Sequence, residues 1–205
     1  MNPTMKIIGS SNHTQEERQK NDYYATDPQA CKDFLWAFQD RDQEELDRMI
    51  WEPACGEGNL AKLLMKRGHI VLATDKIDRD FGNVHDFLEN KDRLEWRGDI
   101  ITNPPYKGNM DIEFVKRSLD IVSPGKWVIM LFKVQFLASK KRYFLFQNLP
   151  PKYIYIHSSR IKIWKNNEDD GGSNALDYAW YVWKKGYEGD TVTRWIPAES
   201  YRGEE

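Results

Sequence analysis

A glycine-rich turn between an apolar strand and a helix limits the possible folds of this chain more than any other stretch. Residues 49–51 (MIW) predict a short buried strand, and residues 52–58 (EPACGEG) predict the turn. Leucines at helical spacing predict a helix over residues 59–67, and a second strand over residues 69–74 ends in Asp75. This order of elements opens an α/β fold whose parallel sheet carries helices on both faces.

The spacing of glycine and acid in this unit indicates a nucleoside site. Gly56 and Asp75 are 19 residues apart, as in doubly wound folds where a carboxylate accepts hydrogen bonds from both ribose hydroxyls. A pyrophosphate on the turn would face Glu52 and Glu57 as well as Asp75, a costly meeting of like charges. S-adenosylmethionine carries a sulfonium and an ammonium instead, so the acids favour this cationic cofactor over a dinucleotide.

An Asn-Pro-Pro-Tyr motif at residues 103–106 follows the next predicted strand, residues 98–102. Consecutive prolines donate no hydrogen bonds and hold φ at about −65°, so the strand stops at Asn103. The Asn103 amide oxygen, the nearby carbonyls and the Tyr106 ring suit a planar substrate with an exocyclic NH2 group. Taken alone, such residues are more often a turn. Because the motif and the glycine-rich turn both leave strands at the carboxyl end, we expect them to share one cleft.

The remaining elements extend this α/β pattern. Asp27 is a good N-cap and Pro28 fits the first position of a helix. Asp86 and Phe87 offer an acceptor and a ring for the adenine of a cofactor, although Asp86 also suits a helix cap or a surface acid. Further helices are predicted over residues 111–121 and 140–146, and strands over residues 126–132, 153–157 and 178–183.

Length and composition fit one domain in a reducing compartment. The 205 residues suffice for one α/β core, and a net charge of −2 excludes a globally basic DNA coat. Cys31 and Cys55 are too far apart for a CxxC pair and imply no disulfide framework. The four histidines have no ligand spacing, so we expect no metal. No apolar run approaches the roughly 18 residues of a membrane span.

One basic stretch stands out against this near-neutral background. Residues 124–166 contain no Asp or Glu. Charge runs are usually solvated faces, but a window of this length without a carboxylate favours contact with phosphates. Its nine positive side chains are Lys126, Lys133, Lys140, Lys141, Arg142, Lys152, Arg160, Lys162 and Lys165.

The order of these motifs resembles that of the DNA amino-methyltransferases that modify N6 of adenine, especially small phage- and prophage-borne forms. Residues 103–106 match the family's catalytic tetrapeptide in full, and the cofactor motifs precede it, as in the gamma arrangement. The resemblance covers residues 22–185, with residues 1–21 expected to be a mobile arm and residues 186–205 a tail. It implies a Rossmann-like class I methyltransferase fold with a mostly parallel seven-stranded sheet and helices on both faces.

The resemblance also implies S-adenosylmethionine as cofactor and direct in-line attack by the amino group of a flipped-out adenine. The Asn103 side-chain oxygen and the Pro104 carbonyl would accept the two amino hydrogens, while Tyr106 would hold the face of the base. The implied catalytic residues are Asn103, Pro104, Pro105 and Tyr106, and the implied cofactor-binding residues are Tyr24, Thr26, Pro28, Glu52, Pro53, Ala54, Cys55, Gly56, Gly58, Asp75, Asp86 and Phe87.

The implied partner is DNA, whose phosphates would contact the basic stretch. Trp164 precedes a glycine-rich loop where the family places a second stacking aromatic residue, although an ordinary tryptophan at the end of a strand explains it equally well. No separate target-recognition domain is expected after the last strand, which leaves the target sequence open. The implied DNA-binding residues are Lys133, Lys140, Lys141, Arg142, Arg160, Lys162 and Trp164.

The family further implies a cytoplasmic enzyme of a bacterial cell, encoded by the host, a phage or a prophage, that acts as a monomer or homodimer without metal or membrane. Other functions stay open. The tetrapeptide also occurs in methyltransferases of RNA and of protein glutamine amides, although the latter usually carry an N-terminal helical domain. A catalytically silent nucleic-acid-binding module needs no intact residues 103–106. A dinucleotide oxidoreductase is the remaining alternative.

Overall fold

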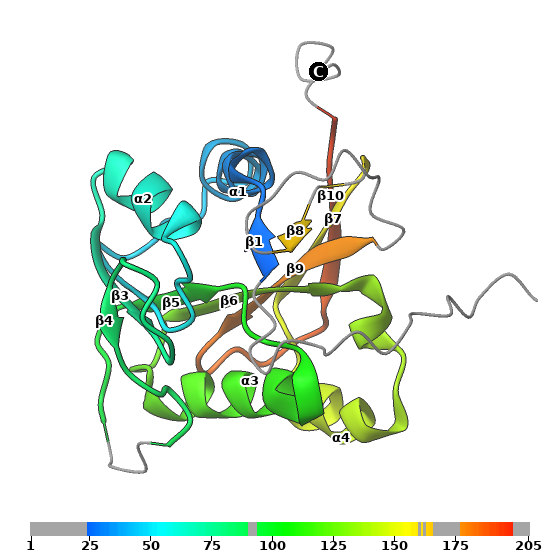
Figure 1. The fold of residues 1–205 in the computed structure, drawn as a ribbon. Helices are drawn as coiled ribbons and strands as arrows, with labels where there is room; N and C mark the ends of the chain where they lie inside the picture. The colour runs from blue at the N-terminus through cyan, green and yellow to red at the C-terminus, as the bar shows by residue number, and fades with distance from the viewer. Residues whose placement is uncertain (1–23, 90–93, 160, 162, 166–176, 199–205) are drawn as a thin grey trace, which may run out of the picture.

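The computed structural model describes residues 24–89, 94–159, 161, 163–165 and 177–198. These residues form three layers, in which an eight-stranded sheet lies between helices (Figure 1). Helices α1 (Pro28–Leu35) and α2 (Asn59–Lys66) cover one face of the sheet. Helices α3 (Met110–Ile121) and α4 (Lys140–Asn148) cover the other face. The predicted α/β fold is therefore confirmed.

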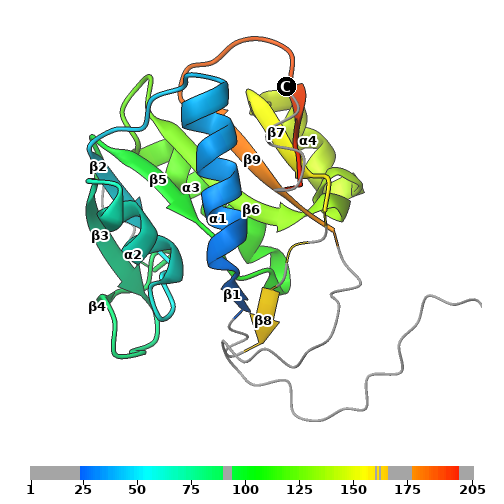
Figure 2. The same ribbon diagram turned by 90° about the horizontal axis from the view of Figure 1, so that it is seen from above.

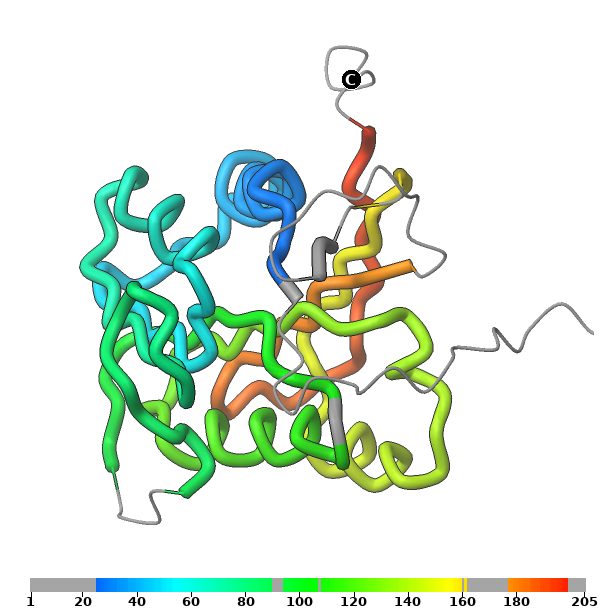
Figure 3. The backbone as a smooth tube through the Cα atoms, viewed as in Figure 1, coloured from blue at the N-terminus to red at the C-terminus, as the bar shows by residue number. Residues whose placement is uncertain are grey.

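The sheet is mostly parallel. Its strands are β2 (Met49–Glu52), β3 (Ile70–Asp75), β4 (Asn83–Val84), β5 (Asp99–Thr102), β6 (Trp127–Lys133), β7 (Tyr153–His157), β9 (Tyr178–Lys184) and β10 (Val192–Ile196). Their order across the sheet is β10-β7-β9-β6-β5-β2-β3-β4. Strand β9 runs antiparallel to both of its neighbours, β6 and β7, and the other described pairs in this sheet are parallel. Figure 3 follows the chain from β3 through β4 towards β5 along one edge of the molecule.

The described sheet has one strand more than the seven we predicted. None of the predicted strand ranges covers β4 or β10. Strand β10 lies in the stretch expected to be a tail, and it pairs in parallel with β7. Its first four residues are exposed and only Ile196 is buried, so its sequence carries little of the apolar pattern that predicts a strand. Pairing with a distant strand, rather than local preference, forms this edge.

A second, two-stranded sheet brings together segments that are far apart in the sequence. Strand β1 (Tyr24–Thr26) pairs antiparallel with β8 (Ile163–Lys165), and Ala25 is the partner of Trp164. Strands of three residues are too short to predict from pattern. The pairing places residues 24–26 beside the backbone of Trp164. The side chains of Trp164 and Tyr24 lie outside the described part of the chain.

The start of α1 follows the prediction. Asp27 caps the helix, accepting a hydrogen bond from the backbone N–H of Gln29 at 2.8 Å, and Pro28 occupies the first turn. The helix continues as a π-helical turn, η1 (Trp36–Arg41). This cap fixes the direction in which the chain enters from β1. Figure 2, seen from above, shows α1 lying across the sheet.

Two aromatic cores hold the layers together. Between α1 and the sheet, Phe34 stacks on Trp180 with ring centroids 4.6 Å apart. On the other face, Phe132 stacks on Phe136 at 4.2 Å. Many of the aromatic residues therefore serve packing, and they make the sheet a rigid base for the loops at its carboxyl edge. Among the described helices, none is long and apolar enough to cross a membrane.

Candidate active site

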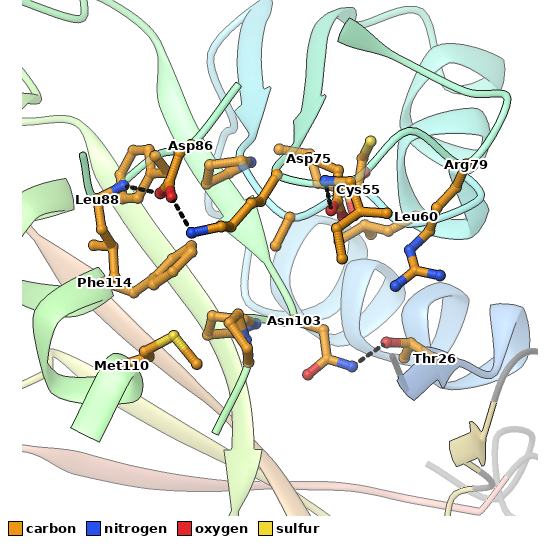
Figure 4. Close-up of a pocket in the computed structure, with 18 of the residues that line it drawn as sticks. Thr26, Cys55, Leu60, Asp75, Arg79, Asp86, Leu88, Asn103, Met110 and Phe114 are labelled. Carbon is orange, nitrogen blue, oxygen red and sulfur yellow. Dashed lines mark hydrogen bonds and ion pairs between the residues drawn. The ribbon is translucent and has the colours of Figure 1, made fainter. Parts of the chain in front are cut away.

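A cavity of about 360 Å³ lies at the carboxyl ends of β2, β3 and β5, a volume that suits a small-molecule ligand. The turn after β2, the loop after β3 and the start of the Asn-Pro-Pro-Tyr motif all line it, so the predicted shared cleft is present (Figure 4). The predicted site residues in its lining are Thr26, Glu52, Pro53, Ala54, Cys55, Asp75, Asp86, Phe87, Asn103, Pro104 and Pro105.

The glycine-rich turn holds Asp75 in place. The backbone N–H of Gly56 donates to Asp75 Oδ2 at 2.9 Å, and that of Ile77 donates to Oδ1 at 3.0 Å. Gly58 has a φ of +83°, a left-handed conformation that favours glycine, and it precedes the first residue of α2. Each carboxylate oxygen keeps a further lone pair for a ligand hydroxyl. The geometry therefore gives a fixed acceptor in the cavity wall.

Glu52 is a buried carboxyl group in the same wall. Glu52 is only 3% exposed, and none of the described residues forms a hydrogen bond with its Oε2 atom. Burial raises the pKa of Glu52 well above its usual range and the charge of Asp75 adds to the increase, although the backbone N–H of Ala61 opposes it. Glu52 therefore has one oxygen without a hydrogen-bond partner and lies near a second acid, Asp75. This arrangement suits the binding of a cationic group.

Asp86 and Phe87 lie at the opposite side of the cavity. Asp86 Oδ1 accepts from the Leu88 N–H at 3.0 Å, and Oδ2 lies 2.6 Å from the ammonium of Lys76 (Figure 4). Phe87 is 2% exposed and packs edge-on against Trp51 at 5.2 Å between centroids. Lys76, which was not predicted as a site residue, therefore reaches the subsite expected for adenine.

The side-chain amide of Asn103 is oriented from both ends. Its NH2 group donates to the hydroxyl of Thr26 at 2.9 Å, and its Oδ1 accepts a hydrogen bond from the hydroxyl of Tyr106. Figure 4 shows the oxygen pointing away from Thr26. Thr26 is buried, so it is a firm anchor. Because an amide oxygen has two lone pairs, Oδ1 keeps acceptor capacity for a substrate.

Tyr106 makes contacts that were not predicted from the sequence, and its stacking role stays a prediction. Its hydroxyl also lies 3.1 Å from the Leu131 carbonyl, and its ring packs near Phe132 and Tyr178 with centroids 6.1 and 6.4 Å away. The ammonium of Lys133 lies 5.7 Å from the centre of the ring. Tyr106 thus helps to orient Asn103, and the ring is half-buried beside the cavity rather than in its lining.

We expect Thr26→Val to slow the reaction catalysed at this site by about 10-fold, because it leaves the Asn103 NH2 group without its anchor while keeping the side-chain volume. Thr26→Ser restores a hydroxyl and should recover most of the rate. Single-turnover rates at saturating cofactor give the comparison. Equal rates for the Val and Ser variants would show that the hydroxyl does not position the amide.

Of the predicted DNA-binding side chains, the structure describes those of Lys133, Lys140, Lys141 and Arg142. Lys140 and Lys141 are exposed on α4, whereas the guanidinium of Arg142 lies 2.6 Å from Asp111 and over the Phe136 ring. The guanidinium of Arg142 is therefore engaged by a buried acid inside the protein. Arg160 and Lys162 lie outside the described residues. Elsewhere in the basic stretch, Lys126 pairs with Asp47 and Lys152 with Glu44.

Pro28 and Cys55 do not have the same place in the site, and the cavity lining includes residues that were not predicted. Pro28 is not in the cavity lining and contributes through the start of α1. Burial, Glu52 and Asp75 raise the pKa of the Cys55 thiol to about 12, so the thiol stays protonated. Lining residues that sequence reasoning missed are Asn59, Leu60, Lys76, Ile77, Arg79, Leu88, Met110 and Phe114. Of these, Met110 and Phe114 were accessible from sequence, since they stand four residues apart at the start of the helix after the motif.

The fold is that of class I S-adenosylmethionine-dependent methyltransferases. A Listeria monocytogenes protein described as a member of this class matches with a TM-score of 0.57 and 13% identity, over 83% of this chain and 65% of that one. A Pyrococcus horikoshii protein described as an RNA methyltransferase matches with a TM-score of 0.58 and 16% identity, over 79% of this chain and 86% of that one. A Vibrio vulnificus protein described as a modification subunit of a type I restriction enzyme matches with a TM-score of 0.59 and 11% identity, over 91% of this chain and 52% of that one.

These likenesses establish the fold, as predicted. The chain spans 65% of the Listeria protein and about half of the Vibrio subunit. No protein-family model and no curated protein sequence matches it. A fold of this kind does not define the substrate, which depends on the residues of the site.

Proposed function

We propose that this protein transfers a methyl group from S-adenosylmethionine to the N6 amino group of adenine in DNA. The observation that carries the proposal is the orientation of the Asn103 amide, whose NH2 group is held by Thr26 so that its oxygen serves as an acceptor at the cavity. Pro104 follows it directly in the cavity lining, and its carbonyl would supply a second acceptor. Two acceptors side by side match the two hydrogens of an exocyclic amino group.

The acids of the cavity support the choice of cofactor. Glu52 would face the ammonium or sulfonium group, which would give its unpartnered oxygen a counter-charge. Asp75 would accept from the ribose hydroxyls, and Asp86 with Phe87 would meet the adenine. A dinucleotide would bring phosphates towards Glu52 and Asp75, which like charges oppose. When bound, S-adenosylmethionine supplies an electrophilic methyl group.

The residues of the motif would activate the substrate nitrogen. An adenine amino group is a poor nucleophile because its lone pair is delocalised into the ring. Acceptance of both hydrogens by Asn103 and Pro104 favours a pyramidal nitrogen with a localised lone pair, and it stabilises the positive charge that develops there. Holding the reactants in register can contribute roughly 7–11 kcal/mol. Cys55 takes no part as a nucleophile, because its thiol is protonated.

DNA is the acceptor that the surroundings of the site favour. Lys140 and Lys141 are exposed on α4, close in sequence to Lys133, which lies over Tyr106. Positive side chains beside an amino-group site suit a polyanion better than a neutral amide substrate. The Vibrio neighbour described as a modification subunit of a restriction enzyme is compatible with this choice.

The proposal is tested by offering labelled S-adenosylmethionine together with unmethylated DNA, RNA or cell protein in parallel reactions. We expect label in DNA and background in the other two. Label mainly in RNA or protein would overturn the substrate while keeping the methyltransferase reaction. No label in any acceptor, with the cofactor still bound, would support a silent nucleic-acid-binding module instead.

Asp75→Ala should weaken S-adenosylmethionine binding by about 10- to 100-fold, since a charged acceptor with two fixed oxygens is lost. Calorimetry on the purified variant gives this number. The matched control is Asp78→Ala at an exposed acid of the same loop, and it should bind the cofactor like wild type. Unchanged affinity in Asp75→Ala would remove this residue from the ribose site.

A further inference from the structure

We propose that α4 carries the surface on which the DNA strand beside the target adenine lies, with Lys140 and Lys141 at its phosphates and Tyr143 and Phe144 stacked on its bases. We call these four residues the α4 patch. The inference rests on the proposed function and names the part of the protein that holds the substrate strand. The two aromatic residues were not among the residues predicted from sequence to bind DNA.

Tyr143 and Phe144 form an aromatic pair that faces solvent. They are 58% and 69% exposed, and their rings meet edge to face with centroids 5.3 Å apart. Single exposed apolar side chains are ordinary, but two adjacent aromatic rings leave a large apolar area in water. Burying them against flat partners such as nucleobases would be favourable, because every base offers a π-face.

The charge around this pair selects the partner. Lys140 and Lys141 are exposed on the same helix, and residues 124–166 contain no acid. Two other lysines of the basic stretch, Lys126 and Lys152, are paired with acids from the segment before β2. The α4 lysines are thus placed to meet phosphates rather than an internal acid. Aromatic rings with flanking lysines are the elements of single-strand recognition.

Contacts at the base of α4 connect the patch to the active site. Arg142 lies 2.6 Å from the buried Asp111, and the ammonium of Lys141 lies 3.5 Å from Asn109 Oδ1. Asn109 and Asp111 follow the last residue of the Asn-Pro-Pro-Tyr motif by three and five positions, and Met110 between them lines the cavity. A strand that delivers an adenine to Asn103 therefore passes within reach of α4. Figure 1 shows α3 and α4 on the same face of the sheet.

The reaction itself creates bases for the aromatic pair to bind. An adenine must leave the helix to reach the cavity, which unstacks its neighbours. Aromatic side chains beside the site can then take over the lost stacking without reading sequence. The patch would thus favour DNA whose bases are already unpaired.

The aromatic half of the patch is tested with the double variant Tyr143→Ala/Phe144→Ala, which keeps a helix former at both positions. Fluorescence anisotropy measures the binding of a labelled single strand and of the matching intact duplex. We expect about a 10-fold or greater loss for the single strand and a smaller loss for the duplex. Trp195→Ala is the matched control, since Trp195 is 61% exposed on β10, and it should bind like wild type.

The lysine half is tested with Lys140→Ala/Lys141→Ala over a range of salt concentrations. Loss of two phosphate contacts should lower the slope of log affinity against log salt by about 1.4 on a single strand. The control is Lys32→Ala/Lys66→Ala, which removes two exposed lysines from α1 and α2 on the opposite face of the sheet. Its salt slope should match that of wild type.

The outcomes separate this inference from the proposed function. Wild-type methylation of DNA together with unchanged DNA binding in both α4 variants would overturn the α4 patch and leave the function standing. Loss of DNA binding in the α4 variants, with wild-type label found in another acceptor, would support the patch and overturn the function. A change in sedimentation rather than DNA binding in Tyr143→Ala/Phe144→Ala would make the patch an interface between copies and overturn the inference.

Discussion

Asn103→Ala is expected to lower the rate of methyl transfer by about 100-fold or more while leaving cofactor affinity nearly unchanged. The substitution removes the amide oxygen that would accept an amino hydrogen as charge develops on the nitrogen. It leaves Glu52 and Asp75 in place, so the polar partners proposed for the cofactor are kept. Single-turnover transfer and calorimetry on the same preparation separate the two effects.

The matched control for this loss is Asn83→Ala, which removes an exposed amide on β4. It should transfer methyl groups at the wild-type rate. A further variant, Asn103→Asp, keeps an acceptor oxygen and should retain more activity than the alanine variant. If Asn103→Ala transfers as fast as wild type, the motif does not activate the substrate in the manner proposed.

Glu52→Gln is expected to weaken S-adenosylmethionine binding by about 10- to 100-fold, because the cation loses its buried counter-charge. Methylthioadenosine lacks both the sulfonium and the ammonium, and it should bind the variant and wild type alike. This uncharged ligand therefore distinguishes loss of charge from damage to the cavity. A parallel loss of affinity for both ligands would contradict the role of Glu52 as a counter-ion.

The pH dependence of binding gives a second readout for Glu52. Burial raises its pKa well above the usual range in the ligand-free protein, so a cationic ligand has to displace a proton. Affinity should therefore rise with pH until the pH exceeds the raised pKa, and this rise should be absent in Glu52→Gln. Because the folded-state pKa is raised, this group's contribution to stability is full at low pH and falls as pH rises. Without ligand, the Glu52→Gln variant should thus have a melting temperature no lower than that of wild type at neutral pH.

Local patterns in the sequence were sufficient to predict the main elements of the fold and part of the cavity lining. The strand, glycine-rich turn and helix around Gly56 are set by contiguous residues, and the rule that ligands bind at carboxyl ends of parallel strands placed Asn103 in the same cleft. Cavity-lining acids such as Asp75 followed from spacing. These features were predictable because each depends on neighbours in the chain or on sheet topology.

Contacts between distant segments were not accessible in this way. A run of basic residues gave no sign that Arg142 pairs with Asp111, 31 residues earlier, or that Lys76 reaches Asp86 across the cavity. The bond from Asn103 to Thr26 spans 77 residues, and it depends on the cap that starts α1. Strand β10 formed against β7 despite four exposed residues. In each case tertiary packing supplies a partner that local pattern does not encode.

The most direct test of the central claim is nucleoside analysis of DNA after incubation with the wild-type protein and S-adenosylmethionine. Digestion followed by mass spectrometry should reveal N6-methyladenine in unmethylated duplex or single-stranded DNA, and none after incubation with Asn103→Ala. Methylcytosine as the product, or N6-methyladenine formed equally by the alanine variant, would contradict the account of Asn103 as the acceptor that activates adenine N6.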